Sequence, residues 1–339
     1  MAGARVGAAG PSFVCPRCRG PLSHRDEAYR CDACAQDYPV LLGIPDFRLF
    51  PDPWIGLIED REKGTRLEAA TAGLGFAATV RAYWAMTEGT PRTWAERFTE
   101  RAIAAEERAV DWIEAGVPED RLPTGATLLD IGCGTGGLLA AVAGRGGRAI
   151  GVDIAFRWLV VARRRPAIAA GGALLVCANG EHLPFAAASA ESVAIAGTLE
   201  HCREAGAVVR EGRRVLRSGG SLRIRTVNRY SLLREPHVGV WGVGFVPRRW
   251  ADAFVRWRSG QGYIHHRPLS FREVAGALKS AGFDRVRVAA APLLASDRRH
   301  LRGVMGWAAR AYARLRSLPL VGTGLAWVAP ELEARGVAP

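Results

Sequence analysis

Lysine is nearly missing from this sequence, and so is any long hydrophobic run. Lys63 and Lys279 are the only lysines, so the 46 basic residues are almost all arginine, and against 33 acidic residues they give a formal net charge of +13. Such a charge suits a nucleic acid, an anionic membrane or an acidic substrate, but in a chain this rich in alanine and glycine it equally fits a bias in composition. The net charge is therefore compatible with RNA as a partner but does not establish one.

Because no stretch reaches eighteen apolar residues, the sequence predicts no membrane-spanning helix. The first fifteen residues, MAGARVGAAGPSFVC, contain one arginine and no long apolar core, which is not typical of a secretory signal peptide. We therefore expect a cytoplasmic protein, whose seven cysteines are more often metal ligands, small buried residues or reactive thiols than disulfides. Internal repeats are also absent, and 339 residues can build one full domain together with smaller modules.

Four of the cysteines form two Cys-x-x-Cys pairs, twelve residues apart, in CPRCRGPLSHRDEAYRCDAC. Cys15, Cys18, Cys31 and Cys34 can supply four thiolates, the closed tetrahedral set of structural zinc, although disulfides or a chance pairing are alternatives. Since four protein ligands leave no open position, this zinc would stabilise a small module at residues 1–50 and do no chemistry. The segment YPVLLGIPDF, at 38–47, predicts one or two short strands that complete the module.

Residues 51–122 predict a helical connector between this module and the rest of the chain. Apolar side chains recur near helical spacing with charges between them. They are Trp94, Phe98, Ile103, Val110 and Ile113. Gly116 and Pro118 are expected to end the helix.

From residue 123 to 339 the sequence pattern predicts strands that alternate with helices. This alternation is typical of a Rossmann-like, doubly wound α/β sheet. The predicted strands are 126–132, 148–154, 173–179, 192–198 and 221–227. A helix over 270–283 follows, with Ser270 as its N-cap and Gly282 as its C-cap. A further strand begins at Asp284, and the final LEARGVA is expected to form an edge strand.

Two insertions interrupt this plan. Residues 228–269 are rich in aromatic rings and follow the fifth strand, at the edge of the sheet where ligands bind, so they predict a lid or acceptor-binding cap, with a packing flap as the alternative. Residues 296–329 are basic and then apolar, and predict helices. These helices could lie on a membrane surface or pack on the sheet, and packing is the favoured expectation.

The stretch LLDIGCGTGG is an apolar strand that runs into a glycine-rich turn and a helix. Gly132, Gly134 and Gly137 satisfy G-x-G-x-x-G, so a nicotinamide cofactor has to be considered. However, Asp130 would repel a pyrophosphate, whereas it would attract the ammonium and sulfonium of S-adenosylmethionine. Asp153 ends the next strand, the usual place for a carboxylate that binds both ribose hydroxyls. An acidic surface turn, the alternative, explains neither placement.

These residues resemble the class I S-adenosylmethionine-dependent methyltransferases over roughly residues 124–290. ANGEHLPF resembles the third motif of that family, whose acidic residue usually meets the adenine amino group; Asn179 stands there, and its amide can still bind adenine. GTLEHC, at 197–202, resembles the fourth-strand motif, and in RRVLRSGGSLRIRTVN the paired Gly219 and Gly220 resemble the turn into the fifth strand. The resemblance implies a cofactor site formed by Asp130, Gly132, Cys133, Gly134, Gly136, Asp153, Ile154, Asn179, Gly180 and Thr198.

His201, next to Glu200, sits where the active cleft of this family opens. His201 has the pKa range of a general base, and the alternative is a strand-end pair that packs or orients the loop. The Glu-x-x-Glu-His metal motif of some ubiquinone-pathway O-methyltransferases is incomplete because Gly197 takes its first position, so no magnesium is predicted. The cap offers His237, His265 and His266 as substrate contacts, and no zinc-like spacing joins them. The remaining cysteines, expected as small buried residues, are Cys133, Cys177 and Cys202.

The N-terminal module resembles the small zinc-ribbon activators that partner tRNA, rRNA and protein methyltransferases, and less closely the ribbon of a bacterial rRNA guanine methyltransferase. This implies an activator-like module fused to its enzyme. We predict an S-adenosylmethionine-dependent methyltransferase with structural zinc, acting on a small or medium metabolite such as a natural product, quinone or saccharide. The alternatives are an RNA base methyltransferase and a non-catalytic binding subunit that retains the fold.

Overall fold

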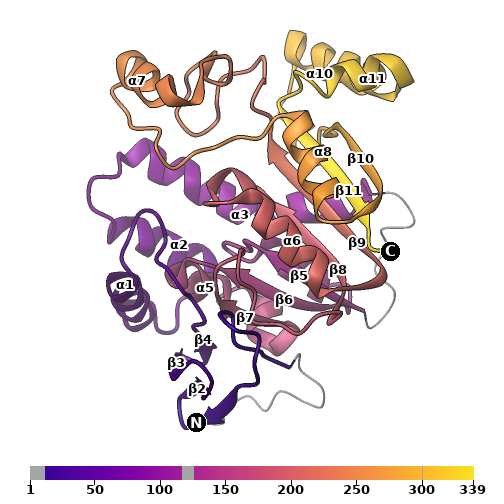
Figure 1. Ribbon diagram of the computed structural model, residues 1–339. Coiled ribbons are helices and arrows are strands. Elements are labelled where there is room, and N and C mark those ends of the chain that lie inside the picture. The colour runs from indigo at the N-terminus through magenta and orange to yellow at the C-terminus, as the bar shows by residue number, and fades with distance from the viewer. Residues whose placement is uncertain (1–11, 117–125, 300) are drawn as a thin grey trace. The chain divides into compact units, whose positions relative to one another are not determined.

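The computed structural model describes residues 12–116, 126–299 and 301–339, and the chain divides into two compact units. Unit 1 comprises the chain up to Val193 together with Arg214–Arg217, and unit 2 comprises Ala194–Arg213 and Ser218–Pro339. Figure 1 labels most of the elements of both.

The central sheet is mixed, with strand order β10-β11-β9-β8-β5-β6-β7. β5, β6 and β7 pair in parallel, whereas β11 is antiparallel to both β9 and β10. The strands are β5 (Thr127–Ile131), β6 (Arg148–Asp153), β7 (Ala173–Cys177), β8 (Ala190–Ala196), β9 (Leu216–Val227), β10 (Asp284–Ala290) and β11 (Glu331–Val337). The predicted α/β class and all five predicted strands are confirmed, with β9 beginning at Leu216 and including both Gly219 and Gly220.

The expectation of an edge strand at the C-terminus is wrong. β11 pairs on one side with β9 and on the other with β10, so its backbone forms strand-to-strand hydrogen bonds along both edges. Glu331 and Glu333 pair across the sheet with Arg225 and Arg223 of β9, at 2.6 and 2.8 Å. Cross-strand ion pairs of this kind let a polar strand take an interior position.

A small antiparallel sheet opens unit 1 and contains the predicted strands of YPVLLGIPDF. Its strands are β1 (Ser23–Arg25), β2 (Ala28–Cys31), β3 (Gln36–Leu41) and β4 (Ile44–Pro45). Leu42 and Gly43 connect β3 to β4 with φ values of 54° and 78°, a turn with both central residues in the left-handed region, which matches the twist of a tight hairpin. Rings of Phe13, Tyr29 and Phe47 pack with centroids 5.0–5.2 Å apart. The module therefore has a very small apolar core.

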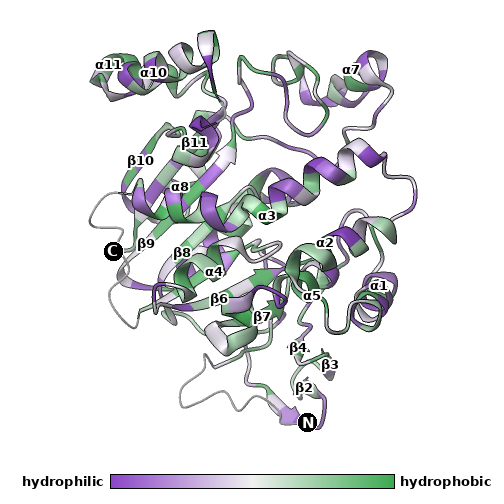
Figure 2. Ribbon diagram, turned by 180° about the vertical axis from the view of Figure 1, so that it is seen from behind, coloured by the Kyte–Doolittle hydropathy of each residue, from purple (hydrophilic) through white to green (hydrophobic). Residues whose placement is uncertain are grey.

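The predicted connector is helical, consisting of α1 (Leu57–Ala70), α2 (Phe76–Ala85) and α3 (Arg92–Glu114). Hydrophilic and hydrophobic residues alternate along α3 (Figure 2). Its buried residues are Thr99, Ala109 and Trp112, none of which belongs to the predicted apolar face, and Ile103 of that face is 40% exposed. Helix α3 ends before Gly116, and Pro118 lies outside the described residues. The other helices of unit 1 are α4 (Gly137–Ala143), α5 (Phe156–Ala162) and a short π-turn at Ile168–Gly172.

Helix α8 (Phe271–Ser280) begins as predicted at Ser270, which forms a capping box with Glu273. Ala281 is its C-cap, and Gly282 follows with a φ of 78°. The predicted helices of 296–329 are present as α9 (Ala295–Arg298), α10 (Gly303–Ser317) and α11 (Pro319–Leu325). Helix α6 (Ala205–Val215) precedes β9. No helix in the described ranges is long and apolar enough to cross a membrane.

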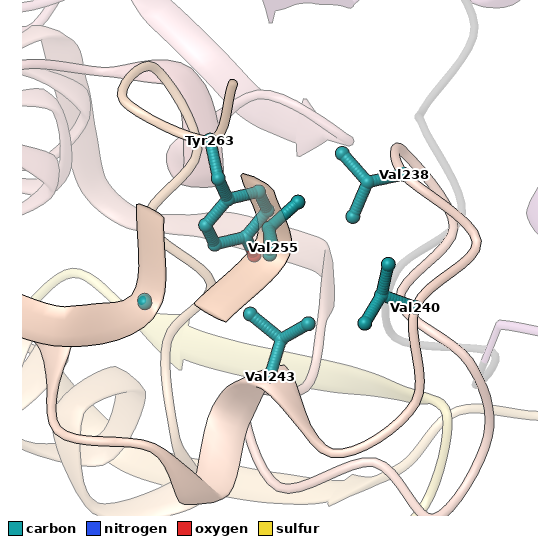
Figure 3. Packing of buried hydrophobic residues seen from close by; sticks show 6 residues of the cluster. Val238, Val240, Val243, Val255 and Tyr263 are labelled. Carbon is teal, nitrogen blue, oxygen red and sulfur yellow. The ribbon is translucent and has the colours of Figure 1, made fainter. Parts of the chain in front are cut away.

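The 228–269 insertion has a small core of its own, built around α7 (Arg248–Ser259) and a 3-10 turn at Val243–Phe245. Its core consists of Val238, Val240, Val243, Ala251, Val255 and Tyr263, whose labelled side chains gather in Figure 3. The tryptophans do not form this core: Trp241, Trp250 and Trp257 are 56–75% exposed. Because the segment packs around its own core, it is compact and not an extended loop; residues 228–269 are called the cap below, and their role as a lid stays a prediction.

Candidate functional site

The glycine-rich turn after β5 is held in an unusual backbone conformation. Gly132, Gly134 and Gly136 have φ values of 81°, 50° and 74°, which glycine adopts without the steric penalty of a Cβ. A Cβ on Gly136 would lie 2.7 Å from the side chain of Ile168. The Gly134 N–H donates to Asp153 Oδ2 at 2.7 Å, so the turn is fixed against the end of β6. This arrangement brings bare backbone close to whatever binds there.

Asp130 and Asp153 lie on adjacent parallel strands and are 3% and 9% exposed. Burial and, to a smaller extent, the charge of Asp153 together raise the pKa of Asp130 to about 7. Burial likewise raises the pKa of Asp153 to about 6, although its carboxylate accepts hydrogen bonds from the N–H groups of Ala155 and Gly134. Two buried carboxylates with raised pKa values are better satisfied by a cationic ligand than by an anionic one. This donor set fits S-adenosylmethionine.

Asn179 is fully buried, and its side-chain amide is engaged with the backbone of the N-terminal module. Its Oδ1 accepts from the Leu49 N–H at 2.7 Å, and its Nδ2 donates to the Phe50 carbonyl at 3.1 Å. These two bonds use much of the hydrogen-bonding capacity of the side-chain amide. The adenine contact of Asn179 stays a prediction, and the side chain has a second role in fixing residues 49 and 50.

A buried ion-pair network lies next to the end of β6, and sequence reasoning missed it. Arg48 donates to Asp46 at 2.7 and 2.9 Å, to Asp60 at 2.6 Å and to the carbonyl of Ile154 at 2.9 Å. Arg157 of α5 pairs with the same Asp60, at 2.7 Å, and with Asp52 at 3.0 Å. The side chains of Arg48, Asp46 and Asp60 are wholly buried. The network ties the tail of the N-terminal module to α1 and α5.

The four cysteines of the N-terminal module converge, with their sulfurs within 4.8 Å of one another. Sulfur-to-sulfur distances are 3.9 Å for Cys15 with Cys34 and 3.5 Å for Cys18 with Cys31. A tetrahedron with zinc–sulfur bonds of about 2.3 Å has edges of about 3.8 Å. The donor set and its spacing therefore fit zinc.

The module packs directly on the parallel part of the sheet in unit 1. Val14 N–H donates to the Pro184 carbonyl at 3.0 Å, Phe47 N–H donates to the Cys177 carbonyl at 2.7 Å, and Arg19 Nη1 donates to the Leu183 carbonyl at 2.6 Å.

Cys133 and Cys177 are buried as expected, and burial raises the pKa of both thiols. Cys202 is only half-buried.

In unit 2, His201, His237 and His266 come together from three separate segments. The Nδ1 atoms of His201 and His266 are 3.3 Å apart, and the three ring centroids are 4.4–5.1 Å from one another. Burial lowers the pKa of His266 to about 3, helped by the charges of His237 and His201. His265 is not part of this cluster. No spacing rule in the sequence joins the three residues, so only the folded chain reveals the cluster.

Glu200 contacts Thr226 of β9 and is 2% exposed. Its Oε2 accepts from the Thr226 hydroxyl at 2.8 Å, its carbonyl accepts from the Arg267 N–H at 2.7 Å, and burial raises the pKa of its carboxyl. The same turn carries Thr198, just before the 3-10 residues Leu199–His201. Hydrogen bonds to Thr226 and Arg267 thus hold Glu200 in place.

A cavity of about 540 Å³ lies in the cap of unit 2. Four arginines and two acidic residues are among its lining: Arg229, Arg248, Arg249, Arg267, Glu235 and Asp252. The excess of positive charge favours an anionic group in the cavity.

Residues 129–224 match the family model described as a methyltransferase domain. A dinucleotide-binding sheet classically has six strands in the order 3-2-1-4-5-6. Read from β7, the order here is 3-2-1-4-5-7-6, with an antiparallel seventh strand. Residues 129–224, which include the glycine turn and strands of this Rossmann-like sheet, therefore match a methyltransferase domain.

Among curated proteins, the chain is 34% identical over 128 residues to the biotin biosynthesis bifunctional protein BioHC of Cellvibrio japonicus, covering 38% of this chain and 23% of that protein. It is 39% identical over 121 residues to the 2-phytyl-1,4-naphtoquinone methyltransferase of Thermosynechococcus vestitus, covering 33% and 48%. The chain thus spans less than half the length of either relative.

Two solved structures are also similar. Geranyl diphosphate C-methyltransferase from Streptomyces coelicolor has a TM-score of 0.45 and 16% identity, covering 69% of this chain and 76% of that one. The complex between the Haloferax volcanii Trm112 methyltransferase activator and a proposed methyltransferase has a TM-score of 0.44 and 17% identity, covering 78% and 97%.

Proposed function

We propose that the protein transfers a methyl group from S-adenosylmethionine to a small or medium metabolite. The observation that carries the proposal is the pair of buried carboxylates, Asp130 and Asp153, around a left-handed glycine turn. When bound, the cofactor supplies an electrophilic methyl group on a sulfonium. Asp130 would attract its positive charges, and Asp153, fixed by two backbone N–H groups, would accept hydrogen bonds from its ribose.

The remaining cofactor contacts are proposed for the segments that surround this pair. Gly132, Cys133, Gly134 and Gly136 would present backbone along the turn, and Ile154 and Gly180 follow β6 and Asn179 in the chain. Thr198 is proposed from the fourth-strand motif alone.

For the acceptor, the sequence offered His201 as a general base. The structure places His201 in a cluster with His237 and His266, so we assign the handling of the acceptor to the cluster and not to His201 alone. Glu200 is proposed as a positioning residue, because its carboxylate is buried and held by Thr226. The arginines of the cavity support an acceptor that carries a carboxylate or phosphate.

A small-molecule acceptor is also the substrate class in the name of the naphtoquinone methyltransferase that this chain resembles. RNA remains the alternative, favoured by the net charge of +13 and by the likeness of the N-terminal module to methyltransferase activators.

Zinc is proposed for the four-cysteine cluster, as a structural ion that does no chemistry. Contact of α10 and α11 with a membrane surface stays the alternative to packing on the sheet; Val304, Trp307 and Leu320 there are 66–89% exposed.

The test is to incubate the purified full chain with methyl-labelled S-adenosylmethionine and either the small-molecule fraction of a cell extract or total RNA. We expect S-adenosylhomocysteine to form with the small-molecule fraction, and the label to appear in a product retained by an anion exchanger. Label in RNA would replace the proposal with an RNA methyltransferase. Absence of S-adenosylhomocysteine with every fraction would support a non-catalytic subunit.

A further inference from the structure

We propose that His201, His237 and His266 form a second metal site, for a zinc-class divalent ion. Their ligand atoms lie within 4.8 Å of one another, and all three residues belong to unit 2, whereas the cysteine cluster belongs to unit 1. Metal binding at this site does not depend on the proposed methyl transfer.

The spacing of the nitrogens fits a tetrahedral ion. With zinc–nitrogen bonds of about 2.0–2.1 Å, two ligands of a tetrahedral centre lie about 3.3–3.4 Å apart. The Nδ1 atoms of His201 and His266 are 3.3 Å apart. The same distance fits a hydrogen bond between two imidazoles. The orientation of the third histidine therefore has to distinguish a metal site from a hydrogen-bonded pair.

His237 is oriented as metal-bound histidines usually are. Its Nδ1 lies 2.6 Å from Oε1 of Glu235, which directs the opposite nitrogen, Nε2, away from that carboxylate. Glu235 is itself buried, and its Oε2 accepts from the N–H groups of His237 and Val238 at 2.8 and 3.0 Å. A carboxylate behind a histidine fixes its tautomer and makes it a better ligand. A simple packing cluster does not require this arrangement.

The three segments that carry the histidines are each fixed by other contacts. His201 ends the 3-10 turn whose Glu200 is buried, and the carbonyl of Glu200 accepts from the Arg267 N–H, next to His266. His237 precedes Val238, a member of the cap core. Ligands held this way are organised before an ion arrives, which lowers the entropic cost of binding it.

The donor chemistry selects the class of ion. Three imidazoles suit zinc, iron, cobalt, nickel or copper, whereas magnesium and calcium prefer oxygen ligands. Three protein ligands also leave a fourth position for water or a ligand oxygen. His266 and Glu235 line the arginine-rich cavity, so an anionic acceptor there could reach that position and become more easily deprotonated. This last consequence, unlike the site itself, rests on the proposed function.

Counting bound metal in the full-length protein tests the site. After incubation with excess zinc and removal of free metal, we expect two zinc ions per chain for the unaltered protein and one for His266→Ala and for His201→Ala. His265→Ala is the matched control, because it removes the neighbouring histidine outside the cluster, and it should keep two. Glu235→Gln should keep the site but bind zinc about 10–100-fold more weakly.

Thermal unfolding of each variant separates loss of a ligand from loss of the fold. One zinc per chain in the unaltered protein, or two in a folded His266→Ala variant, would overturn the proposal. Cobalt adds a second readout: the thiolate charge-transfer absorption of the cysteine cluster should remain in His266→Ala, while one cobalt equivalent is lost. Because neither measurement uses S-adenosylmethionine, failure here is distinct from failure of the proposed function.

Discussion

Arg48→Met is expected to lower the free energy of unfolding by about 3–5 kcal/mol, the usual cost of breaking a buried ion pair from one side. Arg48 is wholly buried and donates to both Asp46 and Asp60. Methionine fills much of the same volume, but it leaves these carboxylates with less compensating charge. The loss can be measured by urea denaturation followed by circular dichroism.

Arg61→Met is the matched control. Arg61 also bonds to Asp46, at 2.8 Å, but its side chain is 30% exposed and makes a single ion pair. A partly exposed pair contributes about 1 kcal/mol or less. Equal losses for the two variants would show that the Arg48 network does not hold the tail of the N-terminal module in place.

Cys31→Ser is expected to remove zinc from the N-terminal module and to unfold residues 13–45. The module has a very small apolar core, while structural zinc contributes about 10–16 kcal/mol to the folding of comparable zinc-finger peptides. Cys31 is fully buried among the four cysteines. The expected result is rapid cleavage of the module by a protease, with the rest of the chain resistant, together with loss of one zinc ion per chain.

Cys202→Ser provides the control, because Cys202 lies outside both proposed metal sites and is half-buried. Its zinc content and protease resistance should match those of the unaltered protein. A zinc-free Cys31→Ser protein that resists the protease equally well would contradict a structural role for the ion.

The sheet and the cofactor turn were predictable because their signals are local. Apolar strands followed by glycine need no knowledge of distant residues, and Asp130 and Asp153 stand at fixed places relative to strand ends. β11 was misjudged because its glutamates find arginine partners on β9 only in the folded chain. The aromatic richness of the cap was visible in the sequence, but its core of valine, alanine and Tyr263 was not.

The histidine cluster and the Arg48 network could not be predicted from the sequence. His201, His237 and His266 follow no metal-binding spacing, and single Arg or Asp residues in a sequence resemble ordinary surface charges. Both features depend on tertiary contacts between residues far apart in the chain. The short segment from Asp46 to Phe50 carries no local signal of the contacts that it makes with Cys177 and Asn179.

The pH dependence of cofactor binding follows from the raised pKa values of the two aspartates. The carboxyl of Asp130, with a pKa of about 7 instead of 3.8, holds a proton in the folded protein that the unfolded chain has lost. Without a ligand, stability therefore falls as the pH rises from about 4 to 7. A cationic ligand prefers the ionised form, so its affinity should rise over the upper part of that range.

Titration of the full chain with S-adenosylmethionine at pH 5.5 and 7.5, by isothermal calorimetry, tests the central claim most directly. For the unaltered protein we expect an affinity about 10-fold or more higher at pH 7.5, because each pH unit below a required pKa costs about a factor of ten. Asp130→Asn should bind about 10–100-fold more weakly at pH 7.5 and lose most of this pH dependence. Asp284→Asn, which alters an exposed carboxylate of β10, should behave as the unaltered protein does. Tight binding by Asp130→Asn with an unchanged pH profile would contradict the account.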